Sequence, residues 1–150
     1  MGLDLKYIFA NQPPVLPDFS SLPQKHIADL FKLNIIKSYS SYYWHKYKEI
    51  GLSNCNSFTW FHELTHAIEA NIFGHSFLAE RDSVRLEDYV KLEREIIANK
   101  MAIELCERYS LPIIAPTEKH LMPQKTNDVI RARLKHIREF IKRHEIFYNS

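Results

Sequence analysis

The sequence predicts an α+β fold, in which a short three-stranded antiparallel sheet packs against several helices. The β signal lies in residues 34–52, where isoleucine, tyrosine and tryptophan are interleaved with polar residues in a pattern that favours strands. Helical patterning covers residues 57–73, 86–109 and 127–147. The chain has 150 residues, of which 45% are hydrophobic and 13% aromatic, so we expect one domain spanning residues 1–150 with a single core.

The N-terminal segment, residues 1–25, is predicted to be an extended arm that runs over the surface. It holds four of the seven prolines, a residue that interrupts both helices and sheets: Pro13, Pro14, Pro17 and Pro23. Residues 26–33 are predicted to form a short helix. Three short strands follow at residues 34–37, 41–44 and 47–52, and we expect them to pair as an antiparallel meander.

A helix of about 17 residues is predicted over residues 57–73 from its end signals. Ser57 is the predicted N-cap, and Gly74 supplies a natural stop. Between them, apolar side chains recur at helical spacing and form a stripe: Phe58, Phe61, Leu64, Ile68 and Ile72. This stripe leaves the intervening polar residues on a different face of the helix.

Two further helices complete the predicted fold. The first covers residues 86–109, where Glu95 is followed on its own face by small side chains that let the helix approach a neighbour closely: Ala98, Asn99 and Ala102. A proline-bearing connector, residues 111–123, then leads to the last helix, residues 127–147. That helix has an apolar stripe for packing: Ile130, Leu134, Ile137 and Ile141.

The last helix also carries an excess of positive charge. Residues 129–150 contain six arginines and lysines against two glutamates, a formal balance of +4. A packing helix with a solvated basic face accounts for this pattern, and we favour it over a helix that binds nucleic acid or an acidic partner. The aromatic residues of the strand region could stack on bases, but we interpret them as sheet and core residues: Tyr39, Tyr42, Tyr43 and Trp44.

The residues that indicate chemistry are His62-Glu63-Leu64-Thr65-His66, in the middle of the 57–73 helix. Histidines four residues apart lie one helical turn apart, so both imidazoles project from one face and can bind the same ion. A glutamate beside the first histidine can reach a water molecule on that ion. This arrangement is typical of a catalytic zinc site.

A catalytic zinc site needs a third protein ligand. The metzincin pattern requires a glycine and a third histidine at fixed distances after the second histidine, and Glu69 and Ile72 occupy those positions instead. The remaining ligand candidates lie downstream: His75, Glu80, Asp82, Glu87, Asp88, Glu93 and Glu95. We favour Glu95 because small side chains follow it, and we place Glu93 second. Asn99, one turn beyond Glu95, is placed to hydrogen-bond a ligating imidazole.

These motifs resemble a known family. The run Phe61-His-Glu-Leu-Thr-His66, followed after 28 residues by Glu95-Ile-Ile-Ala-Asn-Lys-Met-Ala-Ile-Glu-Leu105, is similar to the zincin-like metallopeptidase domain of ArdC-type antirestriction proteins and of the ImmA/IrrE peptidases. Three upstream segments are similar to the strands of ArdC domains in order and spacing: Asn34-Ile-Ile-Lys37, Ser41-Tyr-Tyr-Trp44 and Tyr47-Lys-Glu-Ile-Gly-Leu52. The resemblance implies a gluzincin-like fold, a Zn²⁺ ion and Glu95 as its third ligand.

The chain also departs from that family. ArdC domains usually have a Thr-Gly-His run directly after the second histidine, where this chain has Ala67-Ile68-Glu69. The residues before the matched region are too few for the single-stranded-DNA-binding domain of ArdC. Neither an antirestriction role nor cleavage of a repressor is therefore implied by the resemblance.

From these residues we expect zinc-dependent hydrolysis of peptide bonds in a protein or peptide substrate, such as a regulatory or defence-related protein. His62, His66 and Glu95 would hold the ion, and Glu63 would act as general base. Tyr43, His75 and Tyr89 are candidates for stabilising the oxyanion. A substrate strand would add to an exposed edge of the meander, where residues 42–52 would line the cleft. The alternative is a non-catalytic zincin-fold protein of a mobile element or phage, serving in interactions or associated with DNA.

Composition and the N-terminal sequence indicate where in the cell the protein is expected. The formal net charge is only +2, and no apolar run approaches the roughly 18 residues that a membrane span needs. The N-terminus lacks the basic-then-apolar pattern of a signal peptide, so we expect a cytoplasmic protein without a membrane partner. Cys55 and Cys106 form no recognisable metal or redox motif, and we interpret both as reduced bystanders.

Overall fold

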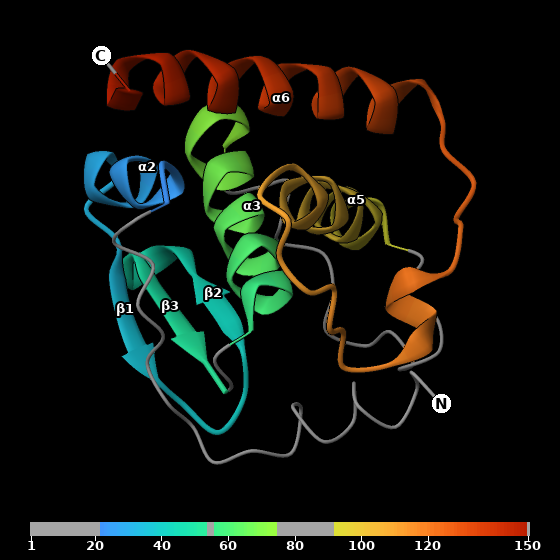
Figure 1. Cartoon of the computed structure of the whole chain (residues 1–150), viewed down its shortest axis with the longest axis horizontal. Helices are drawn as coiled ribbons and strands as arrows, with labels where there is room; N and C mark the ends of the chain where they lie inside the picture. The colour runs from blue at the N-terminus through green and yellow to red at the C-terminus, as the bar shows by residue number, and fades with distance from the viewer. Residues whose placement is uncertain (1–21, 54–55, 75–91, 150) are drawn as a thin grey trace.

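The computed structural model describes residues 22–53, 56–74 and 92–149, with side chains described up to residue 145. The chain forms an α+β fold, as the sequence predicts, with the elements arranged as in Figure 1. The helices described are α2 (Gln24–Leu30), α3 (Ser57–Phe73), α5 (Glu93–Arg108) and α6 (Asp128–Asn149). The strands are β1 (Asn34–Lys37), β2 (Tyr42–Trp44) and β3 (Glu49–Leu52), and two short 3₁₀ helices are η1 (His45–Tyr47) and η3 (Glu118–Leu121). Most of the predicted proline-rich arm, residues 1–21, lies outside the described residues.

The sheet is mixed, so the predicted antiparallel meander is wrong. Its strand order is β1-β3-β2, with β3 parallel to β1 and antiparallel to β2. The central position suits β3 because Ile50 and Leu52 are fully buried, whereas the other two strands are only partly covered. The link from β1 to β2 passes the end of β3, where the Ser38 N–H donates to the Leu52 carbonyl at 2.9 Å.

One glycine fixes how β2 and β3 lie against each other. Tyr42 pairs with Gly51 in the register, and its ring covers the glycine. A Cβ atom at position 51 would lie 2.3 Å from Cε1 of that ring, which is far inside contact distance. The Tyr42 hydroxyl donates to the Glu49 carboxylate two residues earlier on β3, which holds the ring in place.

Helix α3 runs through the middle of the fold. The sheet packs on one side of it and α5 packs along another, so the helix is buried over almost its whole length (Figure 1). Its N-cap is Asn56, whose side chain accepts from the Thr59 N–H at 2.8 Å, so the predicted cap at Ser57 is one residue too late. It ends at Gly74, as predicted, and that residue has a φ of +101°, which favours glycine.

Helix α5 begins at Glu93, and the residue before it, Leu92, has an extended backbone. The sequence predicts a helix that already includes Leu92, and that part of the prediction is wrong. The rest of the predicted first turns, residues 86–91, lies outside the described part of the chain. Ala98 and Ala102 are completely buried, which allows α5 to lie close along α3, as the small side chains predict.

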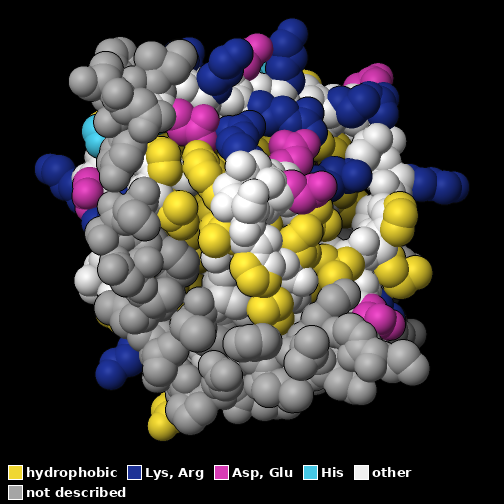
Figure 2. All heavy atoms as spheres, in the orientation of Figure 1, with side chains coloured by type: hydrophobic (Ala, Val, Ile, Leu, Met, Phe, Trp, Pro, Cys, Tyr) yellow, Lys and Arg dark blue, Asp and Glu magenta, His cyan; other side chains and the backbone are white. Residues whose placement is uncertain are grey.

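Helix α6 runs along α5, from Glu93 to Arg108, and along α2, and it passes over the C-terminal end of α3 (Figure 1). Its predicted apolar stripe is buried, and the Asn127 side chain caps its start by accepting from the Ile130 N–H at 2.8 Å. Lysine and arginine side chains gather along its outer face (Figure 2). Several cations of this helix are engaged: Arg131 with Asp128, Arg138 with Glu104, and Arg133 over the Phe73 ring.

A polar cluster joins α6 to the other helices. Glu145 accepts hydrogen bonds from the Tyr109 hydroxyl, from Gln24 Nε2 at 3.0 Å and from the Arg108 guanidinium at 3.0 and 3.1 Å. Gln24 of α2 is fully buried, and its amide nitrogen also donates to the Tyr109 hydroxyl. None of the helices in the described part of the chain combines the length and apolarity that crossing a membrane requires.

Candidate metal centre

Helix α3 brings its two histidines together, as the sequence predicts. Nε2 of His62 and Nε2 of His66 lie 3.2 Å apart, one helical turn from each other. The ligand atoms of His62, Glu63 and His66 all lie within 4.8 Å of one another, so this group could hold a metal ion. Glu63 and His66 are buried and His62 is half-buried, which limits the access of water to the cluster.

Glu95 reaches the same point from α5. One of its carboxylate oxygens lies 3.0 Å from Nε2 of His62, and the other lies 3.0 Å from Nε2 of His66. The small residues Ala98 and Ala102 explain this approach, because they let the two helices pack closely. Thus a carboxylate 33 residues after the first histidine faces both imidazoles.

The spacing of these atoms fits a zinc ion. Ligands about 2.0–2.1 Å from a tetrahedral zinc lie about 3.3–3.4 Å from one another. The three separations here are 3.0, 3.0 and 3.2 Å, so a small outward shift of each side chain would admit the ion. The donor set of two imidazoles and one carboxylate is also one that zinc prefers.

Charge explains why Glu95 is ionised although it is buried. Burial alone would raise the pKa of this carboxyl, but the imidazoles of His66 and His62 beside it hold the pKa well below its usual range. Nε of Arg94 adds positive charge at 3.5 Å from Glu95 Oε2. An ionised carboxylate is the form that binds a cation.

The pKa of Glu63 is shifted in the opposite direction to that of Glu95. Burial raises the pKa of this carboxyl to about 7; His62 opposes the shift and Glu95 adds to it. A carboxyl with a pKa near neutrality can both accept and return a proton at physiological pH. Glu63 therefore has the property that a general base needs.

A third buried carboxyl, Glu69, lies one turn beyond His66 and is a feature that the sequence does not single out. Its side chain is completely buried, neither of its oxygens has a hydrogen-bond partner among the described residues, and one lies 4.0 Å from Nδ1 of His66. Nδ1 of His66 also lacks a hydrogen-bond partner there. Burial raises the pKa of Glu69 well above its ordinary value, helped by the charge of Glu95, and Arg133 and Arg94 oppose the shift.

A cleft of about 120 Å³ opens beside the cluster. His62, Glu63, Glu95 and His120 line it, together with Ser41, Phe58, Thr59 and Pro116. His120 belongs to η3 and comes from the connector that the sequence predicts as irregular. Nδ1 of its ring lies 2.8 Å from Oγ1 of Thr117, and its ring centroid lies 6.3 Å from that of His62. Sequence reasoning missed this residue because nothing in its local pattern places η3 beside α3.

The other predicted site residues lie elsewhere or outside the described chain. The Tyr43 hydroxyl contacts Nδ1 of His45 at 2.7 Å, and Tyr43 is not among the residues that line the cleft. Glu93 contacts Asn127 at the start of α6, and Oδ1 of Asn99 is buried without a hydrogen-bond partner among the described residues. The remaining candidates all fall in residues 75–91, outside the described residues: His75, Glu80, Asp82, Glu87, Asp88 and Tyr89.

Comparisons of the chain with models of known families, with curated proteins and with solved structures find no match. The chemistry of the site is therefore argued from its own residues. A cluster that could hold a metal ion, a buried carboxyl with a pKa of about 7 and a neighbouring imidazole lie at one cleft. These are the groups that metal-assisted hydrolysis requires.

Proposed function

We propose that this protein is a zinc-dependent endopeptidase that hydrolyses peptide bonds in a protein substrate. The observation that carries the proposal is the contact of both imidazoles, His62 and His66, with the carboxylate of Glu95, directly beside the buried Glu63. The ligand set is that of the gluzincins, and the resemblance of these motifs to ArdC and ImmA/IrrE metallopeptidase domains supports the same conclusion.

In this proposal His62, His66 and Glu95 hold Zn²⁺. Bound zinc would supply Lewis acidity, which lowers the pKa of water and polarises a carbonyl group. Glu63 takes a proton from the attacking water and later delivers it to the leaving amine. Burial raises the pKa of Glu63 to about 7 in the metal-free protein, so both its protonated and its ionised form are accessible near neutral pH.

His120 is the candidate that we favour for stabilising the oxyanion. When the Thr117 hydroxyl donates to Nδ1, the ring proton resides on Nε2, where it can donate to an oxyanion. Burial lowers the pKa of His120, with His62 acting in the same direction, so the ring is held in its neutral form. Tyr43, with its hydroxyl bonded to His45, is a weaker candidate for this role.

The sheet offers one edge for the substrate next to the cleft. Strand β3 is central and paired on both sides, so it cannot accept another strand, whereas β2 is paired only with β3 among the strands that the structure describes. Ser41, the residue before β2, lines the cleft. An extended peptide that adds to β2 would therefore lie beside Glu63, with main-chain hydrogen bonds fixing its position.

Metal binding provides the first test of the ligand set. In a calorimetric titration, metal-free wild type should bind one equivalent of zinc. Loss of a residue that only hydrogen-bonds a metal ligand lowers metal affinity by roughly 10- to 100-fold. Glu95→Ala removes a ligand itself, so its zinc affinity should fall by more than this. Glu93→Ala is the matched control, because its carboxylate contacts Asn127 instead of the histidines. Equal zinc affinity in Glu95→Ala and wild type would show that the third ligand is a different residue.

Hydrolysis provides the second test. Zinc-loaded wild type should cleave peptides in a pool of random dodecapeptides, as detected by mass spectrometry. A Glu63→Gln variant with the same zinc content should be slower by about 10²- to 10⁴-fold, the usual contribution of a general base. If wild type binds zinc but cleaves nothing, the non-catalytic alternative, an interaction or DNA-associated protein, replaces the proposal.

A further inference from the structure

A second cavity lies next to the metal cleft, on the outer side of α5. Its volume is about 320 Å³, at the lower end of the range of roughly 300–1,000 Å³ for small-molecule sites. His120 lines both this cavity and the metal cleft, so the two adjoin at this residue. We call this cavity the η3 pocket, because η3 and the residues after it form one of its walls.

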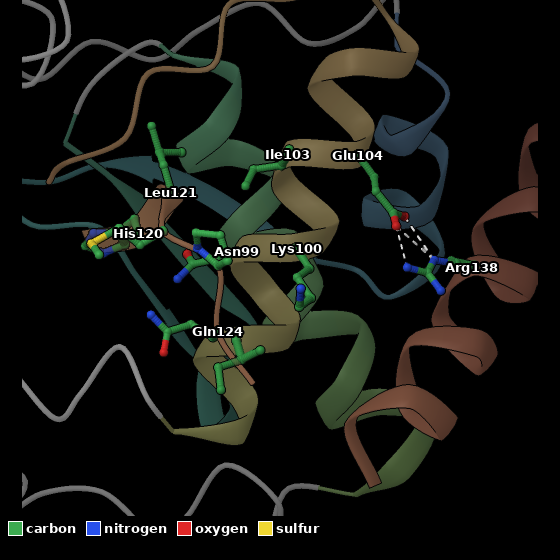
Figure 3. Close-up of a pocket in the computed structure, with 11 residues that line it drawn as sticks. Asn99, Lys100, Ile103, Glu104, His120, Leu121, Gln124 and Arg138 are labelled. Atoms are coloured by element: carbon green, nitrogen blue, oxygen red, sulfur yellow. Dashed lines mark hydrogen bonds and ion pairs between the residues drawn. The ribbon is translucent and has the colours of Figure 1, made fainter. Parts of the chain in front are cut away.

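The walls of the η3 pocket are mainly apolar. Ile96 and Ile103 contribute from α5, and Leu121, Met122 and Pro123 contribute from η3 and the segment that follows. Figure 3 shows Ile103 pointing toward Leu121, and Asn99 on the same side of α5 as His120. Met122 is 57% exposed, so its side chain is accessible to a bound group.

Charged side chains line the pocket in two places, and among the described residues they are paired in only one of them. Glu104 and Arg138 pair with each other at the far end, through two or more hydrogen bonds, so their charges cancel (Figure 3). Lys100 has no ion-pair partner among the residues with described side chains and lies half-buried in the pocket lining. Within the described part of the chain, the η3 pocket therefore has one positive charge without an acidic partner, beside an apolar surface.

We propose that the η3 pocket binds the substrate residue next to the scissile bond, and that it selects a large apolar side chain followed by an acidic residue. The inference rests on the proposed peptidase function. A peptide held at β2 with its scissile bond at Glu63 passes His120, and the side chain beyond that bond enters the apolar pocket. The next residue lies beside Lys100, where a carboxylate balances the ammonium charge.

Cleavage of the random dodecapeptide pool by zinc-loaded wild type tests this directly. The cleaved sequences should be enriched in leucine, methionine or phenylalanine at one position beside the cut, and in aspartate or glutamate immediately beyond. A synthetic peptide with leucine at that position should be cleaved at least about 10-fold more efficiently than its glycine counterpart, as hydrophobic pockets allow.

Two pocket variants separate the two parts of the proposal. Ile103→Trp fills the pocket and should shift the preferred side chain to alanine or glycine, while Val129→Trp adds the same bulk at an exposed position of α6 and should change nothing. Lys100→Glu should remove the acidic preference and retain the apolar one, with Lys135→Glu on the exposed face of α6 as its control. Zinc content and melting temperature establish that each variant is folded.

A binding measurement complements cleavage. The best leucine peptide, labelled with fluorescein, should bind the zinc-loaded Glu63→Gln variant at least about 10-fold more tightly than it binds the Glu63→Gln/Ile103→Trp double variant. Absence of any cleavage by wild type would overturn the proposed function and the inference with it. Cleavage without an apolar preference, or with a preference that Ile103→Trp leaves unchanged, would overturn the inference alone.

Discussion

At the scale of single residues, three buried carboxyl groups differ in pKa because their neighbours differ. Glu95 lies between two imidazoles, which hold its pKa well below the usual range, whereas burial raises the pKa of Glu63 to about 7. Burial also raises the pKa of Glu69 well above its ordinary value. This division supports the proposed roles, since an ionised group suits a cation and a group near neutrality suits proton transfer.

The cleft histidine gives a prediction about catalysis. His120→Phe keeps a ring in place but removes the donor, so kcat should fall by about 10²-fold while KM changes little. His120→Gln retains an N–H donor and should lose less. Steady-state kinetics on one peptide from the cleaved pool would measure both variants, and equal losses in the two would show that the ring only fills space.

Glu69 gives a prediction about stability. Its pKa in the folded, metal-free protein is raised above the ordinary value of 4.5, so the unfolded chain releases this proton at a lower pH than the folded chain does. The free energy of unfolding therefore falls as pH rises above 4.5. Glu69→Gln, which carries no charge, should raise the melting temperature of the metal-free protein at pH 7.5, with a smaller gain near pH 5.

Thermal melts in the presence of a chelator would check this prediction. Glu139→Gln is the matched control, because Glu139 is exposed on α6 and its neutralisation should have little effect at either pH. A lower melting temperature of Glu69→Gln at pH 7.5 would contradict the argument.

At the scale of elements, the helices could be predicted from the sequence and the sheet order could not. Helical periodicity and the stop at Gly74 are local signals, and the structure places α3 and α6 close to where those signals predict them, whereas α5 begins at Glu93 and not at residue 86. Strand order depends on which strand is most deeply covered after packing, and the burial of Ile50 in the centre has no local signature. The approximate positions of the strands could be predicted, but their partners could not.

The same distinction holds in the candidate site. His62, Glu63 and His66 lie on one helix, so their spacing in the sequence predicts their spacing in the structure. Glu95 could be predicted from the small residues that follow it, because they signal a close helix contact. His120 reaches the cleft through the path of an irregular connector, which is a tertiary effect and leaves no pattern in the sequence.

The sheet offers a prediction at this scale. Gly51→Ala places a Cβ against the Tyr42 ring, so it should lower the free energy of unfolding by roughly 1–3 kcal/mol, the usual cost of overpacking. In a Tyr42→Ala background the ring is absent and the same substitution should cost much less. Urea denaturation of the four proteins would measure this difference, and an equal cost in both backgrounds would rule out the ring contact as the cause.

At the scale of the whole molecule, Glu145 ties three helices together. Its carboxylate accepts from Gln24 of α2, from Arg108 at the end of α5 and from Tyr109 just beyond it, and it belongs to α6 itself. Burial and the Glu145 hydrogen bond raise the pKa of Tyr109 to about 12, so the phenol remains a donor at physiological pH. The candidate metal centre lies between α3 and α5, and α6 packs against both of these helices.

This cluster gives a prediction about global stability. Glu145→Ala leaves the half-buried Tyr109 hydroxyl and the buried Gln24 amide without this acceptor, so the free energy of unfolding should fall by roughly 1–3 kcal/mol. Glu107→Ala, at an exposed position of α5, is the control and should change it by less than about 0.5 kcal/mol. Chemical denaturation would measure both, and similar values would show that the cluster adds no stability.

The most direct test of the whole account is hydrolysis in water enriched in ¹⁸O. Zinc-loaded wild type, incubated with the peptide pool, should yield products whose new carboxyl termini carry one ¹⁸O atom, as mass spectrometry would detect. Glu63→Gln with an equal zinc content should yield labelled products at least about 10²-fold more slowly. Labelled products formed equally fast by both proteins, or none from zinc-loaded wild type, would contradict the assignment of this site as a zinc peptidase.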